Sequence, residues 1–135
     1  MEDSGSKLVD VIIPIKTYSE QNLTEHWSKK ARRHKTQQKA VHIALLPYKH
    51  QLQDIFLKIQ PGSKFVIVLN RIAPRKMDYD NLVYSFKFIR DSLCETINPG
   101  LAKGRADDNS HFSFQYDQKR GKVNQYAVQL QIFVL

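Results

Sequence analysis

The sequence has little cysteine, no long apolar run and, over much of its length, almost no acid. Cys94 is the only cysteine, so an internal disulfide is excluded. No apolar run approaches the roughly 20 residues that cross a bilayer. Residues 1–6 have neither the basic nor the apolar part of a secretory signal. Together these absences predict a protein of the reducing cytoplasm.

The chain is instead rich in basic residues. Its 135 residues carry a net charge of +8, with a sequence pI near 9.6. Between Glu25 and Asp78 there are twelve Lys and Arg and a single acid, Asp54, which gives a local net charge of +11. Such an excess indicates a nucleic acid partner first and an anionic membrane surface second. We expect one domain, residues 1–135, with residues 1–7 disordered.

The apolar pattern predicts an α+β fold, in which helices pack on a small mixed sheet in the order β-α-(α)-β-α-β-β. The run 64–72 is apolar enough to be a central strand. The last two strands alternate between apolar and polar residues, and a hairpin turn at 119–122 is expected to join them. The expected strands are 8–15, 64–72, 112–116 and 128–132, and the expected helices are 24–46, ended by Pro47, 48–59 and 79–97.

The most informative motif is Asp78-Tyr79-Asp80-Asn81-Leu82, which follows the second predicted strand and the basic pair Arg75-Lys76. Functional sites in α/β proteins commonly lie where a strand ends and the next helix begins. Mg²⁺ prefers one or two carboxylates together with water and substrate phosphate. Asp107-Asp108, in the loop before a strand, is the natural donor of a third carboxylate. Asp78 is equally suited to cap the following helix.

A helix from residue 79 to residue 97 would place Asp80, Tyr84, Lys87 and Asp91 on one stripe, opposite its apolar face. Lys87 could then contact a scissile phosphate or stabilise the charge that develops on it. The simpler alternative is that Lys87 and Asp91 form an i,i+4 ion pair.

A second candidate feature is the basic helix. From His26 to His50 there are seven Lys and Arg, four His and no acid. This composition predicts a broad cationic surface that grips the phosphate backbone, although a solvated helix face is the ordinary alternative. The candidate DNA-binding residues are Lys29, Lys30, Arg32, Arg33, Lys35, Lys39, Arg75 and Lys76.

The order of these features resembles the RusA family of Holliday junction resolvases, small homodimeric endonucleases of bacteria and their prophages. The resemblance spans about residues 10–135 and rests on the Asp78-x-Asp80-Asn81-Leu82 motif followed by a later Asp-Asp pair. It implies a RusA-like fold, a homodimer, and Mg²⁺, with Mn²⁺ as a substitute. The implied metal ligands are Asp78, Asp80 and Asp108, with Asp107 beside them.

The same resemblance implies a functional lysine on the helix after the motif. An alignment without a gap puts Tyr84 at that position, and one extra helical turn puts Lys87 there, which we prefer. The family also has an arginine just before the first aspartate, where this chain has Met77.

The resulting hypothesis is a Mg²⁺-dependent, structure-selective endodeoxyribonuclease that resolves Holliday junctions or other branched DNA in recombination and repair. The alternative is a non-catalytic basic DNA-binding protein encoded by a phage or prophage. A third possibility is an RNA-binding accessory protein.

Overall fold

A computed structural model describes residues 6–19, 26–100 and 109–135. The described elements, in chain order, are β1 (Ser6–Ile13), α1 (Trp27–Leu45), the 3₁₀ turn η2 (Leu46–Tyr48), α2 (Lys49–Leu57), β2 (Phe65–Ala73), α3 (Tyr79–Ser85), α4 (Lys87–Ile97), β3 (Phe112–Arg120) and β4 (Ala127–Val134). This order confirms the predicted α+β class with a mixed sheet.

The strands form a sheet in the order β1-β4-β2-β3, in which β4 is antiparallel to both β1 and β2, and β3 is parallel to β2. β2 is therefore central, as its apolar run predicts. The predicted hairpin is wrong, because β2 lies between β3 and β4. β3 continues to Arg120, where it still pairs with Ala73 of β2.

The connection from β3 to β4 passes over the end of β2. The backbone N–H of Gly121 donates to the carbonyl of Ala73 at 2.7 Å. A Cβ on Gly121 would lie only 3.1 Å from Ile72 Cγ2 and 2.7 Å from Gln125 Oε1. A side chain at this position would displace the Gln125 amide and press on Ile72, and glycine avoids both contacts.

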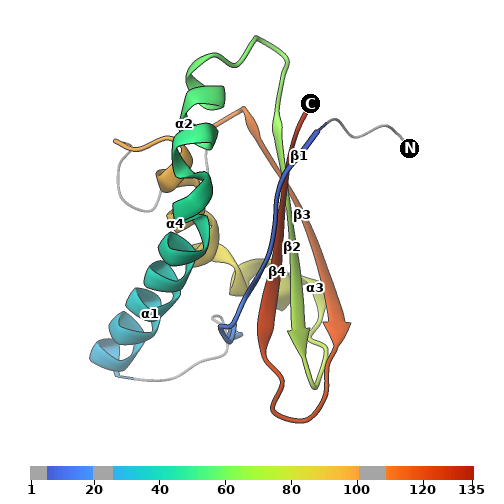
Figure 1. Ribbon diagram of the computed structural model, residues 1–135. Coiled ribbons are helices and arrows are strands. Elements are labelled where there is room, and N and C mark those ends of the chain that lie inside the picture. Colours follow the sequence, from blue (N-terminus) through green and yellow to red (C-terminus); the bar gives the residue numbers. More distant parts are fainter. Residues whose placement is uncertain (1–5, 20–25, 101–108) are drawn as a thin grey trace.

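The helices cover one face of the sheet (Figure 1). Inward-facing residues of the strands, such as Phe65, Ile67 and Leu130, meet the buried sides of the helices in one hydrophobic cluster. From α1, the cluster includes Val41 and Leu45 of the C-terminal half. From α3 it includes Leu82, and α4 contributes a longer run of buried residues.

Several predicted boundaries need correction. Ser6 and Lys7 are not disordered, because they pair with Val134 and Phe133 of β4. The first helix begins at Trp27, where the His26 ring caps the helix by accepting from the Ser28 N–H. Residues 24 and 25 lie outside the described residues. The predicted break at Pro47 is confirmed, because α1 ends at Leu45 and the short turn η2, which contains Pro47, joins it to the separate helix α2.

The predicted single helix 79–97 is two helices, separated at Phe86 (φ −94°, ψ 0°). Arg90 Nη1 donates to the Val83 carbonyl at 2.9 Å and to the Tyr116 hydroxyl at 3.0 Å. Arg90 of α4 thus donates to a carbonyl at the end of α3 and also ties this break to β3 through Tyr116. The fully buried Phe86 ring stacks on Tyr116, at a centroid distance of 5.9 Å.

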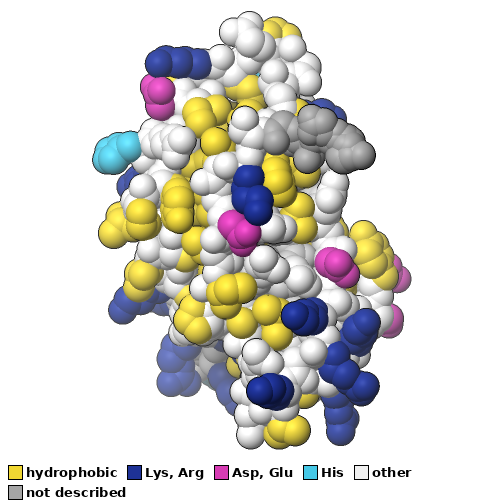
Figure 2. Space-filling model, turned by 45° about the vertical axis from the view of Figure 1, so that its right-hand side comes forward, with side chains coloured by type: hydrophobic (Ala, Val, Ile, Leu, Met, Phe, Trp, Pro, Cys, Tyr) yellow, Lys and Arg dark blue, Asp and Glu magenta, His cyan; other side chains and the backbone are white. Residues whose placement is uncertain are grey.

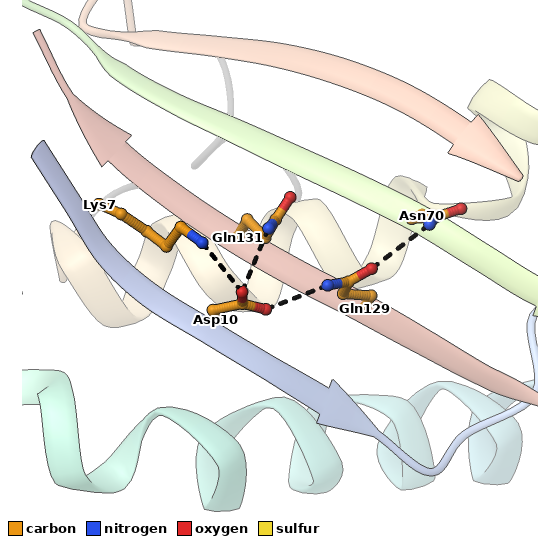
Figure 3. A network of polar contacts seen from close by, with 5 residues as sticks. All are labelled: Lys7, Asp10, Asn70, Gln129 and Gln131. Atoms are coloured by element: carbon orange, nitrogen blue, oxygen red, sulfur yellow. Dashed lines mark hydrogen bonds and ion pairs between the residues drawn. The ribbon is translucent and has the colours of Figure 1, made fainter. Parts of the chain in front are cut away.

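The opposite face of the sheet carries a polar network that spans three strands (Figure 3). Asp10 accepts from Gln129 at 3.1 Å and from Gln131 at 3.2 Å, and it pairs with Lys7 at 3.1 Å. Asn70 of β2 extends the network to Gln129. These bonds, led by that from Gln129, hold the pKa of Asp10 below its usual value.

In the described ranges, no helix is both long enough and apolar enough to span a membrane.

Candidate metal and nucleic-acid site

The two motif carboxylates lie at the start of α3, directly after β2. Asp78 is the N-cap: its Oδ1 accepts from the Asn81 N–H at 3.0 Å, and its carbonyl accepts from the Leu82 N–H at 2.9 Å. The capping role of Asp78 is thus present. Asp80 lies in the first turn of α3 and is exposed. Helical Cα–Cβ bonds tilt toward the N-terminus, so Asp80 leans toward the cap.

The loop that carries Asp78 is held from three sides by side chains of the sheet. Gln118 of β3 grips the Met77 backbone twice: its Oε1 accepts from Met77 N at 3.0 Å and its Nε2 donates to Met77 O at 2.7 Å. Arg71 Nη1 donates to the Arg75 carbonyl at 2.7 Å. Arg120 Nε donates to the Pro74 carbonyl at 3.2 Å. These hydrogen bonds fix the backbone of the loop just before Asp78.

Arg71 is a buried cation, only 8% exposed, at the end of the central strand. Its Nε donates to the Thr17 hydroxyl at 3.0 Å, so this one side chain joins the segment after β1 to the acid-bearing loop. Burial lowers the pKa of Arg71, because desolvation disfavours the charged form.

The donor chemistry at this loop suits Mg²⁺ better than a softer metal, because both candidate ligands are carboxylates. Among the described residues, no group of three or more His, Cys, Asp and Glu side chains is arranged to hold a metal ion. The predicted third donors, Asp107 and Asp108, lie outside those residues. The described part of the site thus offers two carboxylates, which fits Mg²⁺ only when water and phosphate complete its shell.

Lys87 and Tyr84 lie on either side of the break at Phe86. Lys87 begins α4, and its Nζ pairs with Asp91 Oδ1 at 3.2 Å, the simpler of the two predicted roles. Tyr84 lies on α3 and is 47% exposed. The predicted surface stripe is wrong at Asp91, which is only 9% exposed because α4 packs against α1 there.

Arg75 and Lys76 are exposed and lie together beside the acid loop. With Arg120 of β3 they line an open hollow of about 600 Å³. Lys and Arg side chains gather at the lower end of the face in Figure 2, the height at which β2 and β3 end in Figure 1. A basic surface therefore adjoins the motif carboxylates, as expected for a phosphate-binding site.

Sequence reasoning missed Gln118, Arg71 and Arg120. Gln118 is one polar residue in an alternating strand, and nothing in that pattern distinguishes it from its neighbours. Arg120 was placed in a hairpin turn that does not exist. Only Arg71 carries a signal, since it is a charged residue in an otherwise apolar run.

The N-terminal half of α1 projects from the core. None of its side chains from Trp27 to Thr36 is buried, and Trp27 itself is 75% exposed. Burial begins at Gln37 and continues with Val41 and Leu45. The predicted basic residues of this helix are exposed, except for the half-buried Arg33: Lys29, Lys30, Arg32, Lys35 and Lys39.

Comparison with family models, with curated proteins and with solved structures found no match. The resemblance to RusA resolvases therefore rests on the motif residues, and the fold adds only its α+β class.

Proposed function

We propose that this protein is a Mg²⁺-dependent endodeoxyribonuclease that acts on Holliday junctions or other branched DNA. One observation carries the proposal: the loop that Gln118 holds at Met77 leads directly into Asp78 and Asp80, and Arg75 and Lys76 of the same loop line a basic hollow with Arg120. Carboxylates next to a cationic surface suit a cation held against a polyanion.

In this proposal the chain supplies positioning and charge. Asp78 and Asp80 would hold the metal with Asp108, which the resemblance implies, and Asp107 would stand beside them. Bound Mg²⁺ would supply the chemistry of lowering the pKa of a water and neutralising the scissile phosphate. Arg75 and Lys76 would orient the phosphate backbone, and Lys87 or Tyr84 would stand near the reacting group.

The basic helix α1 supports DNA as the substrate. The projecting part of α1 presents cations on a surface that the core does not occupy, so a duplex arm can approach it. The family resemblance adds the homodimer, in which two sites related by a two-fold axis would nick opposing strands. It also adds a bacterial or prophage origin and a cytoplasmic location.

The test is cleavage of a synthetic four-way junction with and without Mg²⁺. Asp80→Asn removes one ligand charge from an exposed position and is expected to abolish cutting while junction binding is retained. Asp78→Asn is the more specific test of metal binding, because asparagine caps a helix as well as aspartate does. Asp78→Asn should therefore lose cleavage without losing stability.

Asp54→Asn is the matched control, since Asp54 is an exposed aspartate of α2 whose only described ion pair is with Lys58. It should cut as the wild type does. If the wild type fails to cut any branched DNA with Mg²⁺ or Mn²⁺, or if Asp80→Asn cuts as well as Asp54→Asn, the nuclease proposal is wrong.

The second candidate is a non-catalytic basic DNA-binding protein, and it is favoured by the capping role of Asp78 and by the pairing of Lys87 with Asp91. It predicts salt-dependent binding to DNA that is indifferent to Mg²⁺. A thermal shift with Mg²⁺ or Mn²⁺, measured with junction DNA present, separates the two candidates.

A further inference from the structure

The connection between β3 and β4 extends beyond the end of β2, close to the acid-bearing loop (Figure 1). The Gly121 N–H and the Arg120 side chain tie its start to backbone carbonyls at the end of β2 and just after it. Farther along, the Gln125 N–H donates to the Lys122 carbonyl at 3.0 Å, and Gln125 Oε1 accepts from the Lys122 N–H at 2.8 Å. These bonds give the connection a fixed shape beside the candidate site.

A β-turn forms the tip of this connection, with Val123 and Asn124 as its central residues. Asn124 has a φ of 61°, and a positive φ at the third position is typical of a type II turn. Val123 occupies the second position and is 84% exposed, which makes it the most exposed large hydrophobic side chain among the described residues. Turns usually carry glycine, proline, asparagine, aspartate or serine. A valine at the tip therefore has no evident role in forming the turn.

Cations surround this apolar tip. An open hollow of about 490 Å³ lies along the connection, and its lining includes Lys119, Arg120 and Lys122. Arg120 also lines the basic hollow of about 600 Å³ beside the acid-bearing loop. None of the described residues that line either hollow is acidic. The cationic surface of the candidate site thus extends onto the connection, where it complements the charge of a phosphate backbone.

We infer that this connection recognises the branch point of DNA: Lys119 and Lys122 contact phosphates, and Val123 packs against the face of an unstacked base. Phosphate contacts position a protein on DNA without distinguishing one sequence from another. An apolar side chain gains free energy when it removes apolar surface from water. In an intact duplex the base faces are covered by stacking, whereas at a branch point stacking is interrupted. Several DNA-binding proteins insert apolar side chains between base steps in this way.

The inference rests on the proposed function for its branched substrate, but binding at the tip needs neither metal nor cleavage. The experiment therefore compares a fluorescent four-way junction with a linear duplex of the same arm sequence, by anisotropy in EDTA at constant salt. We expect Val123→Ser to weaken junction binding about fivefold, or about 1 kcal/mol at 1.4 kcal/mol for each factor of ten, and to leave duplex binding unchanged. Val123→Leu keeps an apolar tip and should retain the preference for the junction.

The matched control is Leu57→Ser. Leu57 is an apolar residue of α2 with nearly the same exposure, 83%, and it lies next to the Lys58–Asp54 ion pair instead of beside free lysines. This variant should bind both DNAs as the wild type does. Because Val123 and Leu57 are both exposed, neither serine variant should change the Tm, which separates a lost contact from a lost fold.

The lysines should give a different result from the valine. The double variant Lys119→Gln, Lys122→Gln should weaken binding to junction and duplex alike. It should also lower the magnitude of the log–log salt slope by about 2, since each phosphate contacted on duplex DNA accounts for about 0.9. A 2-aminopurine placed at the branch point reports unstacking directly: its fluorescence should rise when the wild type binds, and rise less with Val123→Ser.

The inference is overturned if the wild type binds junction and duplex equally, or if Val123→Ser prefers the junction as strongly as Leu57→Ser does. Cleavage separates this result from the nuclease proposal. A protein that prefers the junction through Val123 but never cuts it supports the inference and contradicts the nuclease. A protein that cuts junctions while Val123→Ser keeps the full preference contradicts the inference alone.

Discussion

The clamp formed by Gln118 offers a direct test of how the acid-bearing loop is held. Gln118→Ala removes both hydrogen bonds to the Met77 backbone, at 3.0 and 2.7 Å. A neutral hydrogen bond contributes about 0.5–1.5 kcal/mol net, so the free energy of unfolding should fall by about 1–3 kcal/mol. For a chain of this size, each kcal/mol corresponds to roughly 3–6 °C in Tm.

The control is Gln115→Ala, on the same strand but exposed on the other face of the sheet. It makes the same chemical change and should cost no more than about 0.5 kcal/mol. Urea unfolding gives both values, and an unchanged m-value would show that the unfolded states are comparable. If Gln118→Ala is no less stable than Gln115→Ala, the clamp does not hold the loop and the reasoning fails.

Three further outcomes are expected. Asp10 has a lowered pKa in the folded protein, so its stabilising effect is present above the unfolded pKa of about 3.9 and lost as the pH falls through the folded value; urea unfolding should show Asp10→Asn to be less stable than wild type at pH 7, with the difference shrinking as the pH falls through the folded pKa. Arg71→Met should cost about 2–3 kcal/mol, because the Thr17 hydroxyl and the Arg75 carbonyl lose a charged donor; calorimetry would show this. If α1 and its neighbours contact about six phosphates of duplex DNA, log Kd against log salt should have a slope of magnitude near 5, which anisotropy titrations at several salt concentrations measure.

The sequence predicts the elements well, because their signals are local. The central position of β2 follows from its mostly apolar sequence, and the α+β class follows from the order of periodic segments. Strand pairing is not local, and this is why the hairpin prediction failed. The turn begins only after Arg120, with Gln125 N donating to the Lys122 carbonyl, and the parallel pairing of β3 with β2 decides where that turn leads.

In the candidate site, too, the sequence predicts the features that depend on local signals and misses those that depend on contacts between distant segments. Asp78 and Asp80 are visible as a motif, and the capping role of Asp78 follows from its place before a helix. The break at Phe86 is not visible, because the apolar spacing continues through it. At this break Arg90 of α4 donates to Tyr116 of β3, a contact that no local pattern records.

The position of β4 has a consequence for how the chain folds. β1 pairs only with β4 in the described sheet, and the bond from Gln129 to Asp10 joins residues 119 positions apart. Until β4 is made, β1 has no partner and β2 keeps one edge unpaired. Pairing across so long a loop must first overcome the entropy of closing it, which slows folding and leaves apolar strands exposed meanwhile. Pairing of β4 therefore completes the sheet and at the same time covers the strand edges of β1 and β2 through which a partly folded chain could aggregate.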